Sequence, residues 1–269
     1  MNTKKHEIST CVIPAAGIGS RWAPISSYVP KEMLPLNNQP VIEQVITKVL
    51  KSGIKKIVIV ISPQKEIIKR YISENLGKDK AKIIFVYQKT PKGLADVMLL
   101  AKKHIREKAF AMSLPDLPVI SNKAVLLQLI EAFDKTQGKY HIVSFDRFPK
   151  SRRHLYGECK IRRIEPDSKY FNIIHYCPKD KDLSKSHHEN SSLRMSGNYI
   201  FKREIFAAAK MVLESARGEV NERAVLEQSL KDGVPSLCVP IIGKTFDTGY
   251  PQGYATAVIA FFKKSLLVA

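Results

Sequence analysis

Five short apolar segments alternate with helix-patterned segments through the first 150 residues of the chain. The apolar segments cover residues 9–16, 55–62, 81–88, 109–116 and 139–147. The intervening segments carry apolar residues at helical spacing, as in 40–53, which begins with Pro40 and ends with Gly53. Strands joined by helices run parallel, and a parallel sheet needs helices on both faces. We therefore expect an α/β fold with a doubly wound, Rossmann-like mixed sheet that is mostly parallel.

The second half of the chain has a different pattern. Segments 156–166 and 169–178 predict neighbouring antiparallel strands, and 193–201 predicts another strand. Helical patterns follow at 202–216, 222–233 and 251–267. The 269 residues show no internal repeat and no long linker. We expect one domain over 1–269, in which a half of residues 1–150 carries an appended antiparallel part within 151–269.

Composition narrows the classes of partner. The formal net charge is +19, but the lysines are spread along the chain, whereas nucleic-acid binders more often concentrate Arg and Lys with interleaved aromatic residues on one face. This favours a solvated basic surface over nucleic-acid binding. The four cysteines are widely spaced, which is typical of reduced thiols and does not suit a zinc site. No apolar run has membrane-spanning length, and the first ten residues lack a signal-peptide core. We expect a cytoplasmic protein that binds neither nucleic acid nor membrane.

The stretch IPAAGIGSRWAPISSYVPKEMLP, residues 13–35, directly follows the first predicted strand. Small residues at such a junction let backbone N–H groups approach an anion closely. A dinucleotide fingerprint would need a third glycine near Trp22, and a P-loop would end in Gly-Lys-Ser/Thr, so both are excluded. The remaining pattern combines Gly17 and Gly19 with Arg21 and Lys31. It predicts an anion site, since a simple glycine turn with surface cations would rarely combine all these elements.

Three further polar residues stand at or near predicted strand ends. Gln88 ends the third apolar segment, Asp116 ends the fourth, and Asp247 follows a strand-like segment in the second half. Each has an ordinary alternative: Asp116 could cap the next segment, Asp247 could stabilise a turn, and Gln88 could be exposed. Ligands of open α/β sheets bind beyond the carboxyl ends of the strands. Their joint placement therefore favours a functional role.

Taken together and in this order, the motifs resemble those of the sugar-1-phosphate nucleotidylyltransferases, most of all the bacterial UTP–glucose-1-phosphate uridylyltransferases. The resemblance rests on IPAAGIGSR with VPKEMLP, then YQKTPKGLADV, SLPDL, LYGECKI, SGNYIF and FDTGYPQGY. It implies that residues 1–150 form a nucleotide-binding half and 151–269 a sugar-binding and C-terminal half. The implied nucleotide-binding residues are Ala16, Gly17, Gly19, Gln88 and Gly93. The implied sugar-binding residues are Gly157 and Glu219.

The resemblance also implies a reaction. A sugar 1-phosphate attacks the α-phosphorus of UTP and releases pyrophosphate, with Mg²⁺ held by Asp116 and Asp247. Arg21 offers a planar donor fork for phosphate oxygens, and Lys31 offers a compact point charge. These two are the implied catalytic residues. The family commonly forms dimers or tetramers, so the apolar segment YATAVIAFFKKSLL could supply a homo-oligomer interface, but it could as easily pack on the core of its own chain.

The sugar-site motif departs from the family pattern. Where the family has Glu-Lys-Pro, this chain has Tyr176, Cys177 and Pro178. Two alternatives to UDP-glucose synthesis therefore stay open. One is a related transferase with another nucleotide or sugar 1-phosphate, and the other is a non-catalytic, nucleotide-binding regulatory homologue. The retained cations and aspartates favour an enzyme.

Overall fold

The computed structural model describes residues 8–76, 81–147, 159–176 and 193–266. Within these ranges one nine-stranded sheet runs through the whole molecule. Its strands, in spatial order, are β5 (Lys82–Tyr87), β4 (Lys56–Ile61), β1 (Thr10–Ala15), β6 (Ala109–Ser113), β11 (Leu193–Lys202), β8 (His141–Arg147), β12 (Ser236–Pro240), β10 (Phe171–Tyr176) and β9 (Cys159–Arg163).

Two of these strands, β11 and β10, run opposite to the other seven. The mostly parallel mixed sheet expected from the sequence is thus confirmed. The five apolar segments form β1, β4, β5, β6 and β8, as predicted. The antiparallel strands β9 and β10 are also confirmed, and they extend the main sheet at its far edge. The order differs from a simple parallel run because β11 lies between β6 and β8 and pairs antiparallel with both.

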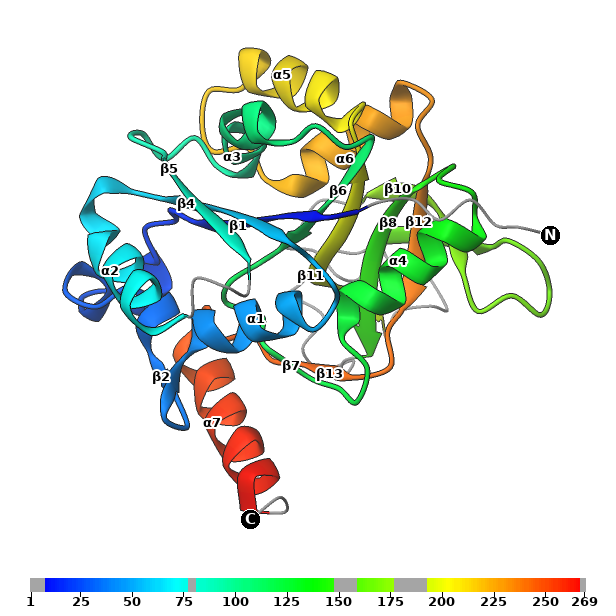
Figure 1. The fold of residues 1–269 in the computed structure, drawn as a ribbon. Coiled ribbons are helices and arrows are strands. Elements are labelled where there is room, and N and C mark those ends of the chain that lie inside the picture. Colours follow the sequence, from blue (N-terminus) through cyan, green and yellow to red (C-terminus); the bar gives the residue numbers. More distant parts are fainter. Residues whose placement is uncertain (1–7, 77–80, 148–158, 177–192, 267–269) are drawn as a thin grey trace, which may run out of the picture.

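Helices cover both faces of the sheet (Figure 1). On one face lie α1 (Val41–Leu50), α2 (Glu66–Asn75) and α4 (Val125–Lys135), and on the other α3 (Leu94–Ala101), α5 (Ile205–Ser215) and α6 (Glu222–Lys231). Each layer has its own apolar cluster against the sheet. Helix α1 shows why: its buried residues recur at helical spacing and form a single stripe. The doubly wound α/β class is confirmed.

The helical pattern between the third and fourth apolar segments covers residues 93–108 and predicts a longer helix than the one observed. α3 ends at Ala101, and the chain continues as one 3₁₀ turn, η5 (Lys102–His104). The buried residue Ile105 then takes an extended conformation that leads into β6. The basic residues of this turn remain outside the core. The helical periodicity of the sequence therefore predicted a helix that is too long at its C-terminal end.

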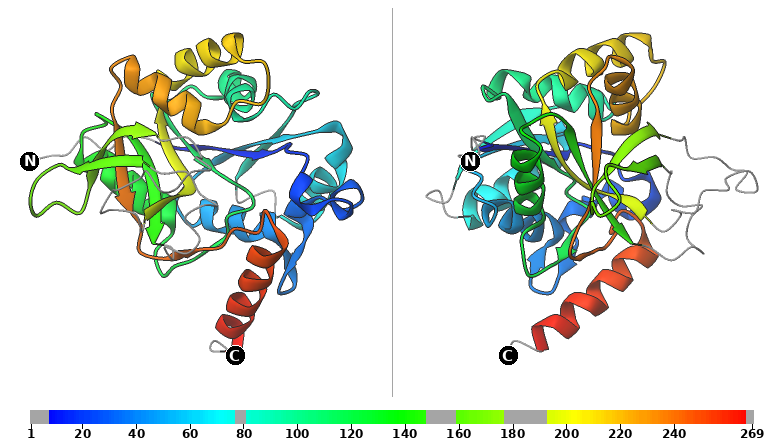
Figure 2. Two further views of the ribbon diagram at one scale, coloured as in Figure 1. Left: turned by 180° about the vertical axis from the view of Figure 1, so that it is seen from behind. Right: turned by 90° about the vertical axis from the view of Figure 1, so that its right-hand side faces the viewer.

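The last helix, α7 (Pro251–Leu266), extends away from the sheet (Figure 2). Its base packs on the short pair β2 (Pro35–Leu36) and β3 (Gln39–Pro40) through a small apolar cluster that includes Phe246 and Phe261. A second short pair joins β7 (Val119–Ile120) to β13 (Lys244–Thr245). Within the described ranges, no helix is both long enough and apolar enough to cross a bilayer.

Candidate functional site

The carboxyl ends of four neighbouring parallel strands meet at one edge of the sheet. Strands β5, β4, β1 and β6 lie side by side with the same direction. Gln88 follows β5, Ala16 follows β1, and Asp116 lies three residues beyond the end of β6. This is the edge where an open α/β sheet binds its ligands.

The glycine-rich segment after β1 folds into three one-turn 3₁₀ helices. They are η1 (Ser20–Trp22), η2 (Ile25–Ser27) and η3 (Lys31–Met33). Gly19 precedes η1 with a φ of 75°, a left-handed conformation that favours glycine. The Trp22 indole donates to the carbonyl of Thr248 at 3.0 Å, and the Thr248 N–H and hydroxyl both donate to the Asp116 carbonyl. These bonds join the glycine-rich segment after β1, the segment after β6 and the loop that carries Asp247.

A cavity of about 460 Å³ opens at this edge. It is lined by most of the predicted site residues: Ala16, Gly17, Arg21, Lys31, Gln88, Gly93, Asp116 and Glu219. Gly19 and Asp247 are not among the lining residues, and the turn at Gly19 instead lies against Ser26 and the Lys31 side chain. Gly157 lies outside the described residues. Most of the site residues predicted from the sequence thus lie around one cavity. They come from both halves of the chain.

The charged groups of the site form opposite-charge pairs. The Lys31 ammonium lies 2.5 Å from Asp116 Oδ2, and Arg21 Nη1 lies 4.0 Å from Asp247 Oδ2. Burial opposes ionisation of Asp116, but Lys31 and Arg21 outweigh it and hold the pKa of this carboxyl below its usual value. Asp247 behaves differently, because burial and the nearby Asp116 charge raise its pKa despite Arg21. The ionised form is therefore favoured at Asp116 and disfavoured at Asp247.

The two aspartates converge on the backbone of Gly249. A Cβ built on Gly249 would lie 2.9 Å from Asp116 Oδ2, 2.9 Å from Asp247 Oδ1 and 2.6 Å from Arg21 Nη2. Only the absence of a side chain lets these atoms share one space. Within the described residues no group of three or more histidine, cysteine or acidic side chains has metal-site geometry. Two hard oxygen ligands suit Mg²⁺, which completes its shell with water and substrate phosphates.

Gln88 presents a defined hydrogen-bonding group. Its amide nitrogen donates to the Gly93 carbonyl at 3.1 Å and to Asp96 Oδ2 at 2.8 Å. Both amide hydrogens are used within the protein, so the amide oxygen is the group that can serve a ligand. The side chain is 5% exposed and lines the cavity. An acceptor held in this way suits a ring N–H donor.

The loop before α6 closes the cavity from the second half of the chain. Val220 forms a parallel bridge with Gly93, and a Cβ on Gly93 would lie 2.4 Å from the Val220 carbonyl oxygen. Gly93 has a φ of +84°, so both its conformation and its space require glycine. The neighbouring residues Glu219 and Asn221 line the cavity. Packing at Gly93 thus places these polar groups opposite the nucleotide half.

The residue at the family's glutamate position does not reach the cavity. Tyr176 ends β10 and is 4% exposed, with its ring in the apolar cluster beneath α6. Its backbone N–H donates to Glu227 Oε2 at 2.9 Å. Cys177 and Pro178 lie outside the described residues. At the position where the resemblance implies a sugar-facing group, this chain therefore has a core residue.

One prominent feature of the site was missed by the sequence reasoning. Lys65 Nζ donates to Glu32 Oε2 at 2.7 Å, and this ion pair is buried directly beside Lys31. The position of Glu32 next to Lys31 was a usable signal. Nothing in the pattern around Lys65 marked it as the partner, because it follows an unrelated strand 33 residues later.

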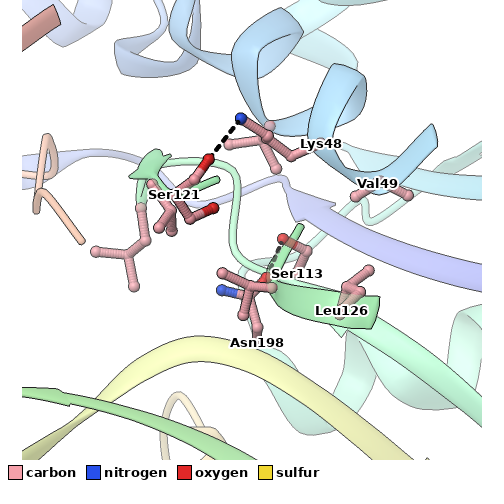
Figure 3. Close-up of a pocket in the computed structure, with 10 residues that line it drawn as sticks. Lys48, Val49, Ser113, Ser121, Leu126 and Asn198 are labelled. Carbon is pink, nitrogen blue, oxygen red and sulfur yellow. Dashed lines mark hydrogen bonds between the residues drawn. The ribbon is translucent and has the colours of Figure 1, made fainter. Parts of the chain in front are cut away.

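Apart from the site, a much smaller cavity lies between α1, α4 and β6 (Figure 3). Its volume is about 20 Å³, enough for about one water molecule. Lys48 donates to the Ser121 carbonyl at one end, and Ser113 donates to Asn198 at the other. The rest of its lining is largely apolar, so it is a packing feature of the core.

Comparisons with known proteins agree with this geometry. Residues 10–263 match the model of the nucleotidyl transferase family. The UTP–glucose-1-phosphate uridylyltransferase of Mycoplasma pneumoniae is 31% identical over 93% of this chain and 91% of its own length. The Bacillus subtilis protein of the same name is 27% identical over 95% of this chain and 91% of its own. A solved UDP-glucose pyrophosphorylase in complex with UDP-glucose has a TM-score of 0.83 and 25% identity, covering 96% of this chain and 100% of that one.

Proposed function

The chain belongs to the nucleotidyl transferase family, and we propose that it transfers a uridylyl group from UTP to glucose 1-phosphate, giving UDP-glucose and pyrophosphate. The observation that carries this proposal is the meeting of Arg21, Lys31 and Asp116 around one cavity at the carboxyl ends of the strands. The printed names of the curated relatives supply the substrate pair.

The reaction demands positioning and charge neutralisation rather than a covalent catalyst. Two anionic reactants must meet, and negative charge grows on the departing pyrophosphate. Arg21, which is half exposed at the cavity rim, offers a bidentate fork for that group. Lys31 lies deeper, with its side chain 14% exposed, and suits the α-phosphate as a point charge.

Asp116 and Asp247 are the residues that would hold Mg²⁺, since their carboxylates share the space beside Gly249. The bound ion would neutralise phosphate charge as a Lewis acid. The remaining work falls to the protein. The Thr248 bonds to the Asp116 carbonyl keep the two carboxylates together before any ligand arrives.

Base selection would rest on Gln88. Uracil carries an N–H at ring position 3, where cytosine carries a bare acceptor. An amide oxygen facing the cavity can accept from uracil and would repel cytosine. Ala16 and Gly17 would contribute backbone contacts beside it. This supports UTP as the nucleotide, with thymidine triphosphate as the nearest competitor.

The sugar side would depend on Glu219 and Asn221, because Tyr176 is committed to the core. We also propose that residues 1–269 act as a single domain, with 1–150 as the nucleotide half and 151–269 as the sugar and C-terminal half. The sheet supports this, since strands of both halves alternate within it. A UTP-consuming reaction fits the cytoplasm.

A second copy of the chain is the partner we propose for α7. Ile259, Phe262 and Leu266 are each more than half exposed and recur at helical spacing on this projecting helix. Light scattering coupled to size-exclusion chromatography should give a mass of at least two chains. Phe262→Ser should shift it toward one chain, whereas a wild-type monomer would contradict the interface.

The deciding experiment measures pyrophosphate release from UTP, glucose 1-phosphate and Mg²⁺. We expect turnover in the wild type and loss of at least about a hundredfold in Asp116→Ala, the scale of several kcal/mol. Asp167→Ala is the matched control, because this exposed aspartate lies in the turn between β9 and β10 at the opposite edge of the sheet.

Parallel reactions separate the alternatives. Turnover only with CTP, thymidine triphosphate or another sugar 1-phosphate would identify a related transferase. UTP binding without turnover of any pair would point to a regulatory homologue and contradict the enzyme assignment.

A further inference from the structure

The buried ion pair between Glu32 and Lys65 borders the cavity, where Glu32 is one of the lining residues, and it has no place in the chemistry above. Lys65 Nζ lies 2.7 Å from Glu32 Oε2, and the two side chains are 8% and 1% exposed. Lys65 ends the turn η4 (Pro63–Lys65), which follows β4. Glu32 is the middle residue of η3, directly after Lys31. The pair therefore ties the signature segment to the end of a neighbouring strand.

Stability alone is a weak reason for such a pair. Removing two charges from water costs several kcal/mol for each ion, and the mutual attraction often does no more than offset that cost. A well-packed apolar pair at the same positions is commonly as stable or more stable. Burial lowers the pKa of Lys65 even though Glu32 counteracts it, which shows how large the desolvation cost is here. A positional role accounts for the pair better than stability does.

The geometry of η3 supplies that role. A 3₁₀ turn has about three residues per turn, so adjacent side chains diverge by roughly 120°. Glu32 points to Lys65, and this directs Lys31 toward Asp116, where its ammonium lies at 2.5 Å. The turn itself has only two backbone hydrogen bonds, from Met33 and Leu34, and no side-chain cap. The ion pair is thus a side-chain anchor of this turn that is independent of the contact between Lys31 and Asp116.

Glu32 also keeps two lysines apart. Lys65 is close enough to Lys31 and Asp116 to interact electrostatically with both. Without the Glu32 carboxylate, Lys65 would repel Lys31 and compete with it for Asp116. The pair thus reserves Asp116 for Lys31.

We propose that Glu32 and Lys65 are positioning residues, a buried ion pair that fixes the Lys31 ammonium in the nucleotide cavity without contacting the reacting groups. The inference rests on the proposed function of that cavity. It adds two residues to the proposed site, of which Glu32 lies in the signature segment and Lys65 lies outside it.

The test compares Glu32→Gln, Lys65→Met and the double variant Glu32→Met with Lys65→Met. Each single variant leaves a buried group unpaired and should lower both the thermal midpoint and kcat. The double variant should regain the wild-type thermal midpoint, because it buries no charge. Its kcat should stay reduced by roughly tenfold to a hundredfold, the effect of a catalytic group misplaced by about 1 Å.

A purely structural pair gives the opposite result. If the double variant recovers both the midpoint and a kcat within about threefold of wild type, the positioning role is wrong. The matched control is the double variant Lys123→Met with Glu131→Met. It removes an exposed ion pair with 2.5 Å between Lys123 Nζ and Glu131 Oε1, in which Lys123 precedes α4 and Glu131 lies within it. It should leave both quantities unchanged.

UTP binding, followed by calorimetry, separates this inference from the proposed function. A wild-type chain without turnover contradicts the proposed function alone. The double variant should then bind UTP roughly tenfold more weakly than wild type, since Lys31 is no longer held at the phosphates. Equal UTP affinity in the folded double variant would overturn the inference.

Discussion

Gly249→Ala would place a methyl group inside the space shared by the site's charged groups. The new Cβ would lie 2.6 Å from Arg21 Nη2 and 2.9 Å from one oxygen each of Asp116 and Asp247. Ordinary contact begins near 3.4 Å, so these atoms must retreat by 0.5 to 0.8 Å. A displacement approaching 1 Å at a catalytic centre costs about a hundredfold in rate. We expect kcat/KM to fall by about that factor, or about 2.7 kcal/mol.

Folding stability should change little in the same variant. The three crowded atoms are the ends of side chains, and the φ of Gly249 is not in the left-handed region. We expect the free energy of unfolding to change by less than about 1 kcal/mol. Gly218→Ala is the matched control, since its added Cβ would meet no atom within 4 Å. It should retain wild-type kinetics.

Two assays check this reasoning. Pyrophosphate release gives kcat/KM, and electron paramagnetic resonance with Mn²⁺ measures cation binding in the presence of UTP. Both should be impaired in Gly249→Ala and intact in Gly218→Ala. A Gly249→Ala enzyme with kcat/KM within about threefold of wild type would refute the shared carboxylate site.

The remaining predictions concern separate parts of the molecule. Gly17→Ala should keep wild-type stability but bind UTP more weakly in calorimetry, since its Cβ meets nothing in the free protein and faces the cavity. Gly93→Ala should lose about 2–5 kcal/mol of unfolding free energy in urea, because its Cβ would meet the Val220 backbone and its φ is +84°. Asp96→Ala should reduce the preference for UTP over CTP in competition assays, because the Gln88 amide would lose the bond that orients it. Burial lowers the pKa of His141 to about 3, so below pH 6.5 the folded state binds fewer protons than the unfolded chain. The free energy of unfolding should therefore fall by up to about 1.4 kcal/mol per pH unit as the pH drops from about 6.5 toward 3. Urea titrations that give the same unfolding free energy across this pH range would contradict the prediction.

The parallel part of the fold was accessible from sequence because its strands are buried on both faces. Segments such as 55–62 are continuous β-branched runs between helical patterns, which leaves little choice of architecture. The place of β11 was not accessible. Its pattern predicts a strand, but its insertion between β6 and β8 depends on pairings with residues more than 45 positions away along the chain.

The candidate site shows the same division. The placement of Gln88 and Asp116 at the sheet edge could be predicted because each lies within three residues of the end of a strand, where topology brings ligands, whereas Arg21 and Lys31 were found only through the glycine-rich pattern. The role of Tyr176 was not predictable. A strand alternates its side chains between faces, and only the register of β10 against its neighbours decides that this residue enters the core.

The pairing of charges would let so basic a chain hold the metal site proposed above. In the free protein Lys31 already neutralises Asp116, and Arg21 faces Asp247. An incoming triphosphate offers these cations stronger, multidentate partners. As they turn to the phosphates, the two carboxylates are left near each other and uncompensated, and the raised pKa of Asp247 shows that this arrangement is unfavourable without a cation. The nucleotide and the divalent cation should therefore bind cooperatively. The phosphates draw Lys31 and Arg21 away from the two carboxylates, and the divalent cation replaces the positive charge that is lost there.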